Sequence, residues 1–237
     1  DQRMATLVAE KDPQQPLFIW GYHQLWHGAM SKARIESIAG QRPTVVWHRS
    51  FHELYMNSAA MEMVGVVAED IKPGMQINIE RGHFYEGGLG YAINRLNPWI
   101  LAPDKYAAGL QRLKQVVHHG GHTSIGDLAT GMFNFSAEAE ALSQYLEGDD
   151  VPFRTRLVAH STVLTKGGVP PTQGPELAEA LQQRNSHRLH FGRHIKLFSD
   201  GAFFSQLAQL QQPGYIDGHS GEWPVSYTHL TLPTIRL

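Results

Sequence analysis

The chain of 237 residues contains no cysteine. This absence excludes disulfide bonds, thiolate zinc sites and cysteine nucleophiles together. A bound metal ion would have to be held by histidine, aspartate, glutamate or a modified lysine, and the 14 histidines supply candidates. Most histidines in proteins are surface or hydrogen-bonded residues without a ligand role, so their number alone does not predict a metal centre.

Three further features are missing or weak. No apolar run approaches the roughly 18 residues of a membrane-spanning helix, and the net charge is only −2. We therefore expect neither a nucleic-acid partner nor a membrane partner. The glycine-rich stretch 82–90 lacks both the spacing of a dinucleotide fingerprint and the Lys-Ser/Thr pair of a phosphate loop, which argues against nucleotide binding.

The two ends of the sequence look artificial. The chain begins at Asp1 without an initiator methionine, and residues 224–237 resemble the conceptual translation of a sequencing-library adapter. A native edge strand is the alternative, because Val225, Tyr227 and Thr231 suit one. We favour the adapter interpretation and leave this tail out of fold reasoning. The sequence is then expected to be a fragment of an open reading frame, cut at both ends.

Helical and strand patterns alternate in residues 101–223. Helices are predicted at 103–119, 136–148 and 175–184, and strands at 122–127 and 153–160 and around Lys196. Alternation of this kind predicts parallel βαβ units. Polar residues near the strand ends suit a (β/α)8 barrel, in which the active site lies at the carboxyl ends of the strands. A doubly wound sheet follows the same rule and stays open as an alternative.

The first hundred residues have a different pattern. Short apolar strands are predicted at 16–20 and 44–47, and an amphipathic helix at 53–62. We interpret residues 1–100 as an α+β insertion that packs on the mouth of the barrel formed by 101–223. His23 and His27 have the spacing of a metal pair on a helix. The nearby glycines make that helix doubtful, so a structural or rim role is preferred for both.

Lys196 is the most informative residue of the chain. It is expected in the middle of a strand, between Ile195 and Leu197, and a buried ammonium group costs several kcal/mol unless it is paired or neutralised. One explanation is carbamylation by CO2, which converts the lysine into a carboxylate-like oxygen donor for one or two divalent metals. The other is an ion pair with Asp200 or with another carboxylate of the barrel. The strand alone does not separate the two.

Three segments that occur in order carry a family resemblance: 50–61, 120–127 and 195–202. They contain a histidine followed by Asn-Ser-Ala, a Gly-Gly-His-Thr-Ser strand that ends in aspartate, and Ile-Lys-Leu-Phe-Ser-Asp-Gly. Together they resemble the YtcJ-like branch of amidohydrolase family 3, and 214–223 resembles the loop that follows in relatives. The resemblance covers most of residues 15–223.

The resemblance implies a metal-dependent hydrolase of C–N bonds on a (β/α)8 barrel, with this chain supplying roughly strands 2–4 and an insertion after strand 1. The cofactor would be a divalent metal, usually zinc, as one or two ions. Lys196 matches the family's metal-binding lysine, which favours the carbamylated ligand. The family's His-x-His pair, its later histidines and its aspartate have no counterpart here. We therefore expect residues 1–237 alone to be inactive, although the intact protein would be a hydrolase.

No catalytic residue is assigned, and three residues are predicted to bind substrate. His52 matches a pocket histidine of the family, Glu86 is placed at the mouth, and Asp127 ends a predicted barrel strand. Structural roles remain open for all three. The expected partner is a small amide, N-acyl compound or cyclic ureide, and a homo-oligomer is compatible with the sequence. The alternative function is a non-catalytic barrel relative that binds a ligand or acts as a scaffold.

Overall fold

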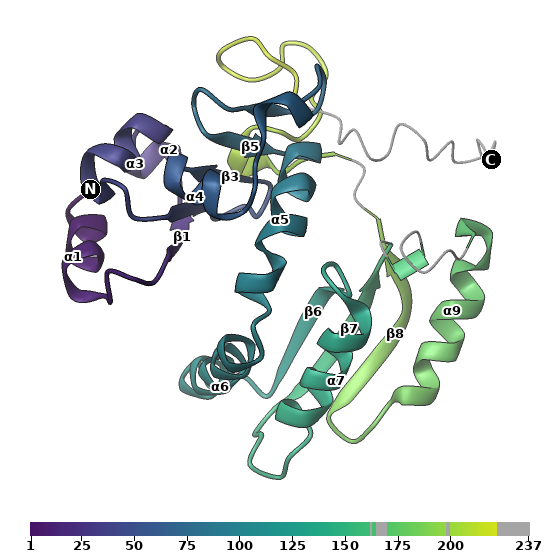
Figure 1. Ribbon diagram of the computed structural model, residues 1–237. Coiled ribbons are helices and arrows are strands. Elements are labelled where there is room, and N and C mark those ends of the chain that lie inside the picture. The colour runs from purple at the N-terminus through teal and green to yellow at the C-terminus, as the bar shows by residue number, and fades with distance from the viewer. Residues whose placement is uncertain (162, 165–169, 198–199, 222–237) are drawn as a thin grey trace. The chain divides into compact units, whose positions relative to one another are not determined.

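The computed structural model describes residues 1–161, 163–164, 170–197 and 200–221 (Figure 1). They fall into two compact units, and the division lies within helix α5. The first unit contains Asp1–Leu96 and the described residues from 200 onward, and the second contains Asn97–Leu197. The sequence pattern instead predicts residues 200–221 as part of the segment 101–223 with the βα units. The role of residues 1–100 as an insertion on a barrel mouth stays a prediction, and residues 224–237 lie outside the described residues.

The first unit contains helices, 3-10 turns and a five-stranded sheet. In chain order its elements are α1 Gln2–Glu10, β1 Leu17–Tyr22, α2 Gln24–His27, α3 Lys32–Ala39, β2 Thr44–His48, β3 Glu53–Met56, α4 Ser58–Met63, η1 Ala68–Asp70, β4 Ile77–Asn78, β5 His83–Tyr85, α5 Gly87–Ile100, which continues into the second unit, and η4 Phe203–Ser205. The strand order is β1-β2-β3-β5-β4, and only the β1–β2 pair is parallel.

Strand β2 lies inside this sheet, between β1 and β3, and all five of its residues are buried. The strands predicted at 16–20 and 44–47 are confirmed as β1 and β2, each slightly longer than expected. Val45 and Val46 are almost fully inaccessible to solvent, as expected for a strand covered on both faces. His48 ends β2, and a buried polar side chain at that position requires hydrogen-bond partners.

The helix predicted at 53–62 is wrong in its first half. Residues Glu53–Met56 form strand β3, which pairs with β2 and with β5, and only Ser58–Met63 is helical. Asn57 separates the two elements and caps α4, because its side-chain oxygen accepts a hydrogen bond from the backbone N–H of Ala60. A short apolar run does not distinguish strand from helix by periodicity, and pairing across the sheet decides the matter.

The second unit is built around three parallel strands. Its elements are α6 Pro103–His119, β6 Ser124–Thr130, α7 Phe135–Leu146, β7 Arg154–His160, η2 Pro171–Gln173, α9 Gly174–Leu181, η3 Gln182–Arg184 and β8 Leu189–Lys196. The order is β6-β7-β8, and both pairs are parallel. Figure 1 shows the strands side by side, with α7 and α9 connecting them in sequence. These are two consecutive βαβ units, as the sequence predicts.

The helix predicted at 103–119 has these bounds in the structure. It begins at Pro103, whose missing N–H costs nothing in the first turn, and ends before Gly120. The strand predicted at 122–127 is displaced and runs from Ser124 to Thr130. The helix predicted from Ser136 begins at Phe135, because the side chain of Asn134 forms the cap by accepting from the N–H of Ala137.

The core of the second unit lies between the strands and the helices. Its buried residues include Leu142 and Leu146 from α7, Leu157 from β7 and Phe191 from β8. Three parallel strands with intervening helices give a mixed α/β fold. They occur in barrels and in doubly wound sheets alike, so the partial (β/α)8 barrel stays a prediction. In the part of the chain that the structure describes, no helix is both long and apolar enough to cross a membrane.

Candidate functional site

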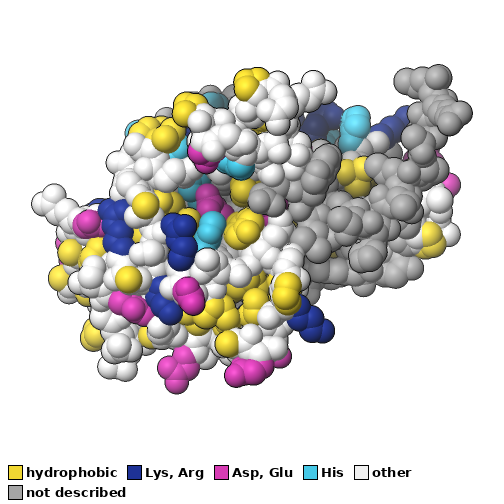
Figure 2. Space-filling view, turned by 90° about the horizontal axis from the view of Figure 1, so that it is seen from above, with side chains coloured by type: hydrophobic (Ala, Val, Ile, Leu, Met, Phe, Trp, Pro, Cys, Tyr) yellow, Lys and Arg dark blue, Asp and Glu magenta, His cyan; other side chains and the backbone are white. Residues whose placement is uncertain are grey.

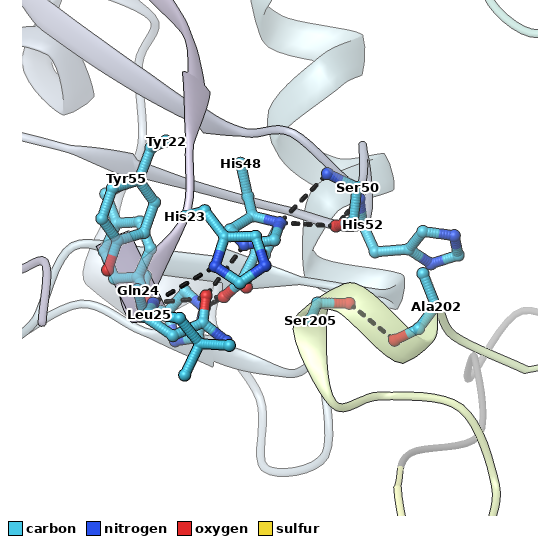
Figure 3. Close-up of polar contacts among 12 residues, drawn as sticks. Tyr22, His23, Gln24, Leu25, His48, Ser50, His52, Tyr55, Ala202 and Ser205 are labelled. Atoms are coloured by element: carbon cyan, nitrogen blue, oxygen red, sulfur yellow. Dashed lines mark hydrogen bonds and ion pairs between the residues drawn. The ribbon is translucent and has the colours of Figure 1, made fainter. Parts of the chain in front are cut away.

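The turn between β2 and β3 is held by the buried ring of His48. Its Nδ1 accepts a hydrogen bond from the backbone N–H of Ser50 at 3.1 Å and lies 2.7 Å from the Ser50 hydroxyl. Its Nε2 lies 2.8 Å from Oε1 of Gln24, which accepts only, so Nε2 donates and Nδ1 is the acceptor (Figure 3). Both ring nitrogens of His48 therefore fix neighbouring segments of the unit.

Burial keeps His48 neutral near neutral pH. Loss of solvent lowers its pKa from 6.5 to about 4, because a charged imidazolium would have to exist away from water. The carboxylate of Glu53, 3.9 Å from Nδ1, opposes this shift, and the positive charge of Arg49 adds to it. A neutral ring can accept from Ser50 and donate to Gln24 at the same time, which a protonated ring cannot. His48 is a structural support for the turn that follows it.

That turn brings together His52 and Glu86, two of the predicted substrate-binding residues. Nδ1 of His52 lies 2.9 Å from Oε1 of Glu86, and the carboxylate is almost entirely buried while the imidazole remains partly exposed. The backbone N–H of Glu86 also donates to the carbonyl of His52. A carboxylate accepts only, so Nδ1 carries the hydrogen and Nε2 of the neutral ring is an acceptor. This geometry orients one imidazole for hydrogen bonding or for proton transfer.

The backbone at this pair adopts an unusual conformation. Phe51, which precedes His52, has φ 69°, and Glu86 itself has φ 43°. Non-glycine residues seldom occupy this left-handed region, and such residues cluster at functional sites when the surrounding structure holds them. Here the hydrogen bond between His52 N–H and the Ser50 hydroxyl, at 3.1 Å, supports the first of them. The pair is therefore held by contacts of both backbone and side chains.

The segment from Asp200 to Leu207 packs against the same pair. A Cβ atom at Gly201 would lie 2.5 Å from Oε1 of Glu86 and 2.3 Å from Cβ of Leu207, so only glycine fits there. In Figure 3 the ring of His52 lies beside Ala202, at the start of the turn that contains Ser205. Segments 52, 86 and 201 are remote in sequence, and the first unit brings them together. The carboxylate of Asp200 is used locally, where it accepts from the N–H of Gln209.

A second histidine–glutamate pair connects two strands of the five-stranded sheet, β3 and β5. Glu53 is buried, and its Oε2 lies 2.5 Å from Nε2 of His83 and 3.3 Å from the hydroxyl of Tyr55. The His83 ring stacks on Tyr55 with centroids 4.3 Å apart. Burial, reinforced by the charge of Glu53, raises the pKa of Tyr55. Sequence reasoning missed this network, because the histidine and the glutamate are 30 positions apart and share no motif.

His23 and His27 have the structural role predicted for them, but the doubt about a helix there is wrong, because Gln24–His27 forms the short helix α2. Nδ1 of His23 accepts from the N–H of Leu25 and caps the short helix α2. Nδ1 of His27 accepts from the N–H of His23 at 3.0 Å, and its ring also faces Tyr22. The two rings thus stabilise a turn, and neither Nδ1 atom points to a shared ligand position.

Asp127 and Lys196 both belong to the second unit, on strands that β7 separates. The Asp127 carboxylate accepts from the N–H of Ala129 at 3.0 Å and from the hydroxyl of Thr130 at 2.8 Å. These contacts span the irregularity in the pairing of β6 with β7. Lys196 is the last residue of β8 and is partly buried, so the expectation that it lies in the middle of a strand is wrong. Its register partner is His160, the last residue of β7.

The described residues do not form a complete metal centre. Among residues 1–161, 163–164, 170–197 and 200–221, no three side chains of histidine, aspartate or glutamate lie close enough together to hold an ion. A metal site in a protein requires three or more ligands in one place. Lys196, even as a carbamate, would supply one of them. The residues present therefore do not fit a metal ion by themselves, and we assign no chemical step to one.

Comparison with known proteins identifies a shared fold. No known family's sequence profile matches the chain, and no curated protein matches it. Two crystal structures do. An uncharacterized metal-dependent hydrolase from Pyrococcus horikoshii OT3 has a TM-score of 0.56 and 18% identity, over 94% of this chain and 42% of that chain. One from Pyrococcus furiosus has a TM-score of 0.54 and 22% identity, over 93% of this chain and 43% of that chain. The chain thus has a mixed α/β fold similar to that of metal-dependent hydrolases and spans about two fifths of their length.

Proposed function

We propose that this chain is part of a metal-dependent hydrolase that cleaves a C–N bond in an amide, an N-acyl compound or a cyclic amide. The observation that carries the proposal is the position of Lys196. It ends a parallel strand, opposite His160 at the end of the neighbouring strand, in a fold similar to that of metal-dependent hydrolases. Catalytic groups of parallel α/β folds gather at this edge. The sequence motifs at 50–61, 120–127 and 195–202 resemble those of amidohydrolase family 3. This resemblance is the reason for proposing that the bond cleaved is a C–N bond.

In this proposal Lys196 is carbamylated. Its neutral amine attacks CO2, a C–N bond forms, and a proton is released, so that the side chain ends in a carboxylate-like group. The cofactor would be one or two divalent ions, with zinc expected. The other ligands would lie outside the described residues, because these supply no set of three. The three strands of the second unit would then be strands 2–4 of a (β/α)8 barrel.

His52, Glu86 and Asp127 are proposed to act on the substrate side. The buried Glu86 carboxylate fixes the imidazole of His52, and Nε2 of the partly exposed ring can accept a hydrogen bond from an N–H or O–H group of the substrate. Asp127 is proposed separately, as a substrate-binding residue of the second unit whose carboxylate is oriented by the hydrogen bonds that both of its oxygens accept within β6. All three are positioning or binding residues, and no catalytic residue is assigned.

The test compares the 237-residue chain with a longer polypeptide that carries further sequence from the same gene at both ends. Both are incubated with zinc and 13C-bicarbonate, and are assayed on N-acyl amino acids, simple amides and cyclic ureides. We expect hydrolysis and a lysine carbamate signal only in the longer protein, and loss of both in Lys196→Ala. Lys72→Arg is the control, because Lys72 is an exposed residue of the first unit. Full activity and zinc content in Lys196→Ala would refute the assignment.

A second candidate function is a non-catalytic relative that binds a ligand or acts as a scaffold. The observation that favours it is that no three-ligand group exists among the described residues. In that case the longer protein would bind a small amide with the affinity unchanged by zinc or by a chelator, and would not turn it over. Zinc-dependent turnover of any compound in the panel would exclude this candidate.

A further inference from the structure

Strand β1 forms one edge of the five-stranded sheet and leaves backbone groups open at that edge. The N–H of Leu17 donates to the carbonyl of Pro43, so Leu17 faces the neighbouring strand β2. Backbone groups of successive strand residues point to opposite sides, and those of Phe18 and Trp20 therefore point away from β2. Among the described residues, none bonds to these groups on that side. Such an edge can pair with a further strand.

The side chains at this edge are aromatic and exposed. Phe18 and Trp20 lie on the same face of β1, with exposed fractions of 38% and 59%. The ring of Trp20 lies 6.3 Å from that of Trp47 and 5.8 Å from that of Phe51, measured between centroids. Exposed hydrophobic side chains are common, and Figure 2 shows them in yellow at many places on one face of the molecule. Here two of them stand beside open backbone groups, so one pairing event would bury both.

Trp47 indicates that this face is incomplete. Its exposed fraction is only 8%, and its indole N–H is buried without an acceptor among the described residues. Together with Phe18 and Trp20 it lines a cavity of about 60 Å³. A buried indole N–H usually has a hydrogen-bond partner. We therefore expect this face to be covered by atoms that the described residues do not supply.

The charge of the edge suits a second copy of the same chain. Residues 13–22 contain no charged side chain. In a two-fold symmetric contact, a charge near the axis meets the same charge of the other copy, so a neutral edge avoids this repulsion. Sheet edges that stay single usually carry lysine or another charge within the strand. Strand β1 lacks this protection.

The backbone favours one register for two antiparallel β1 strands. Outward-facing residues must meet, so the central choices are Phe18 opposite Phe18, Phe18 opposite Trp20, or Trp20 opposite Trp20. The first places Pro16, which has no N–H, opposite Trp20. The third places Tyr22 opposite Phe18, although the Tyr22 carbonyl already accepts from the N–H of Arg49 at 2.9 Å. Only the second uses all open groups of Phe18 and Trp20.

We propose that β1 binds a second copy of this chain by antiparallel pairing, with Phe18 of each copy opposite Trp20 of the other. Aromatic pairs across strands stabilise such a contact. The exposed parts of the two side chains amount to roughly 200 Å² in each copy. Because contacts below about 1,200 Å² in total are weak, we expect a dimer that dissociates on dilution. The pairing closes both β1 edges, and it is independent of the proposed function.

The test follows the association of the 237-residue chain by sedimentation velocity, from about 1 µM to about 1 mM. We expect the wild type to change from monomer to dimer within this range. Trp20→Lys removes an aromatic contact and brings two cations near the axis, so it should weaken dimerisation by at least about tenfold. Phe203→Lys is the matched control, because Phe203 is an exposed aromatic residue outside the sheet. It should dimerise like the wild type.

Mixing two variants tests the register. Phe18→Glu should also weaken dimerisation when it is measured alone. In a mixture with Trp20→Lys, the proposed register places the new lysine opposite the new glutamate and leaves one aromatic pair intact. Opposite charges across two strands attract, so the mixture should associate more tightly than either variant alone, by about threefold or more. This gain should decrease as salt is added.

Each remaining outcome overturns the inference. A wild-type chain that stays monomeric over the whole range has no such contact, and unchanged dimerisation of Trp20→Lys would place the interface elsewhere. Mixing without a gain in association would exclude the register. If Phe18→Glu does not fold by circular dichroism, Trp20→Lys and its control decide alone. A longer polypeptide from the same gene that stays monomeric would show that its additional sequence, and not a second copy, covers the edge.

Discussion

Acidification should weaken the first unit through His48. This histidine is fully buried, and loss of solvent lowers its pKa from 6.5 to about 4. The unfolded chain therefore binds a proton between these two values that the folded chain does not, and stability falls as the pH falls through this window. The contribution is present above pH 6.5 and decreases toward pH 4.

The magnitude follows from the two pKa values. At pH 5 the unfolded imidazole is almost fully protonated, whereas the folded one is still almost fully neutral. The difference builds up over the interval from 6.5 to 5, at ~1.4 kcal/mol for each pH unit, so the loss is about 2 kcal/mol between pH 7 and pH 5. Other groups titrate over the same range, so the contribution of His48 is measured against a variant.

The assay is urea unfolding at pH 7 and pH 5, followed by tryptophan fluorescence. Trp20, Trp26 and Trp47 lie in the first unit and report on its transition. We expect His48→Gln to be less stable than the wild type at pH 7, because the turn loses its acceptor for Ser50. Its further loss between pH 7 and pH 5 should be smaller than that of the wild type by about 2 kcal/mol.

A control variant removes a histidine without removing a buried ring. His187→Gln changes an exposed residue and should keep the pH dependence of the wild type. If His48→Gln and the wild type lose the same stability between the two pH values, the buried neutral ring is not responsible and the reasoning fails.

Three further changes test other contacts. Asn57→Ala removes the cap of α4 and the acceptor for the N–H of Thr44. We expect it to lower the free energy of unfolding, measured by urea titration, by roughly 2–3 kcal/mol. A loss smaller than a few tenths of a kcal/mol would contradict this. Glu138→Gln replaces a carboxylate that accepts three backbone N–H groups before α7, and a loss of roughly 1–3 kcal/mol is expected from thermal unfolding of the second unit. Gly82→Ala places a Cβ 2.1 Å from the carbonyl oxygen of Met56, so poor folding by circular dichroism is expected, and wild-type stability would count against the geometry.

The sequence determined the elements whose signals are local. Helix α6 follows its predicted bounds, because Pro103 favours the first turn and glycine follows His119. Asn57 lies next to the helix that it caps, α4, and asparagine is among the residues preferred at that position. The parallel βαβ arrangement of the second unit also follows from the alternation of patterns. In each case the deciding residues lie within one element or next to it in the chain.

The tertiary structure decided where local patterns are ambiguous or where partners are remote. Glu53 begins a strand and not a helix, because β2 and β5 satisfy the backbone on both sides and His83 satisfies the carboxylate. His52 and Glu86 were predicted separately, and only the folded chain brings them within 2.9 Å. Lys196 lies at a strand end, since pairing with β7 fixed the register of β8. Hydrogen bonding between strands depends on which segments meet, and no periodicity within one segment encodes its neighbour.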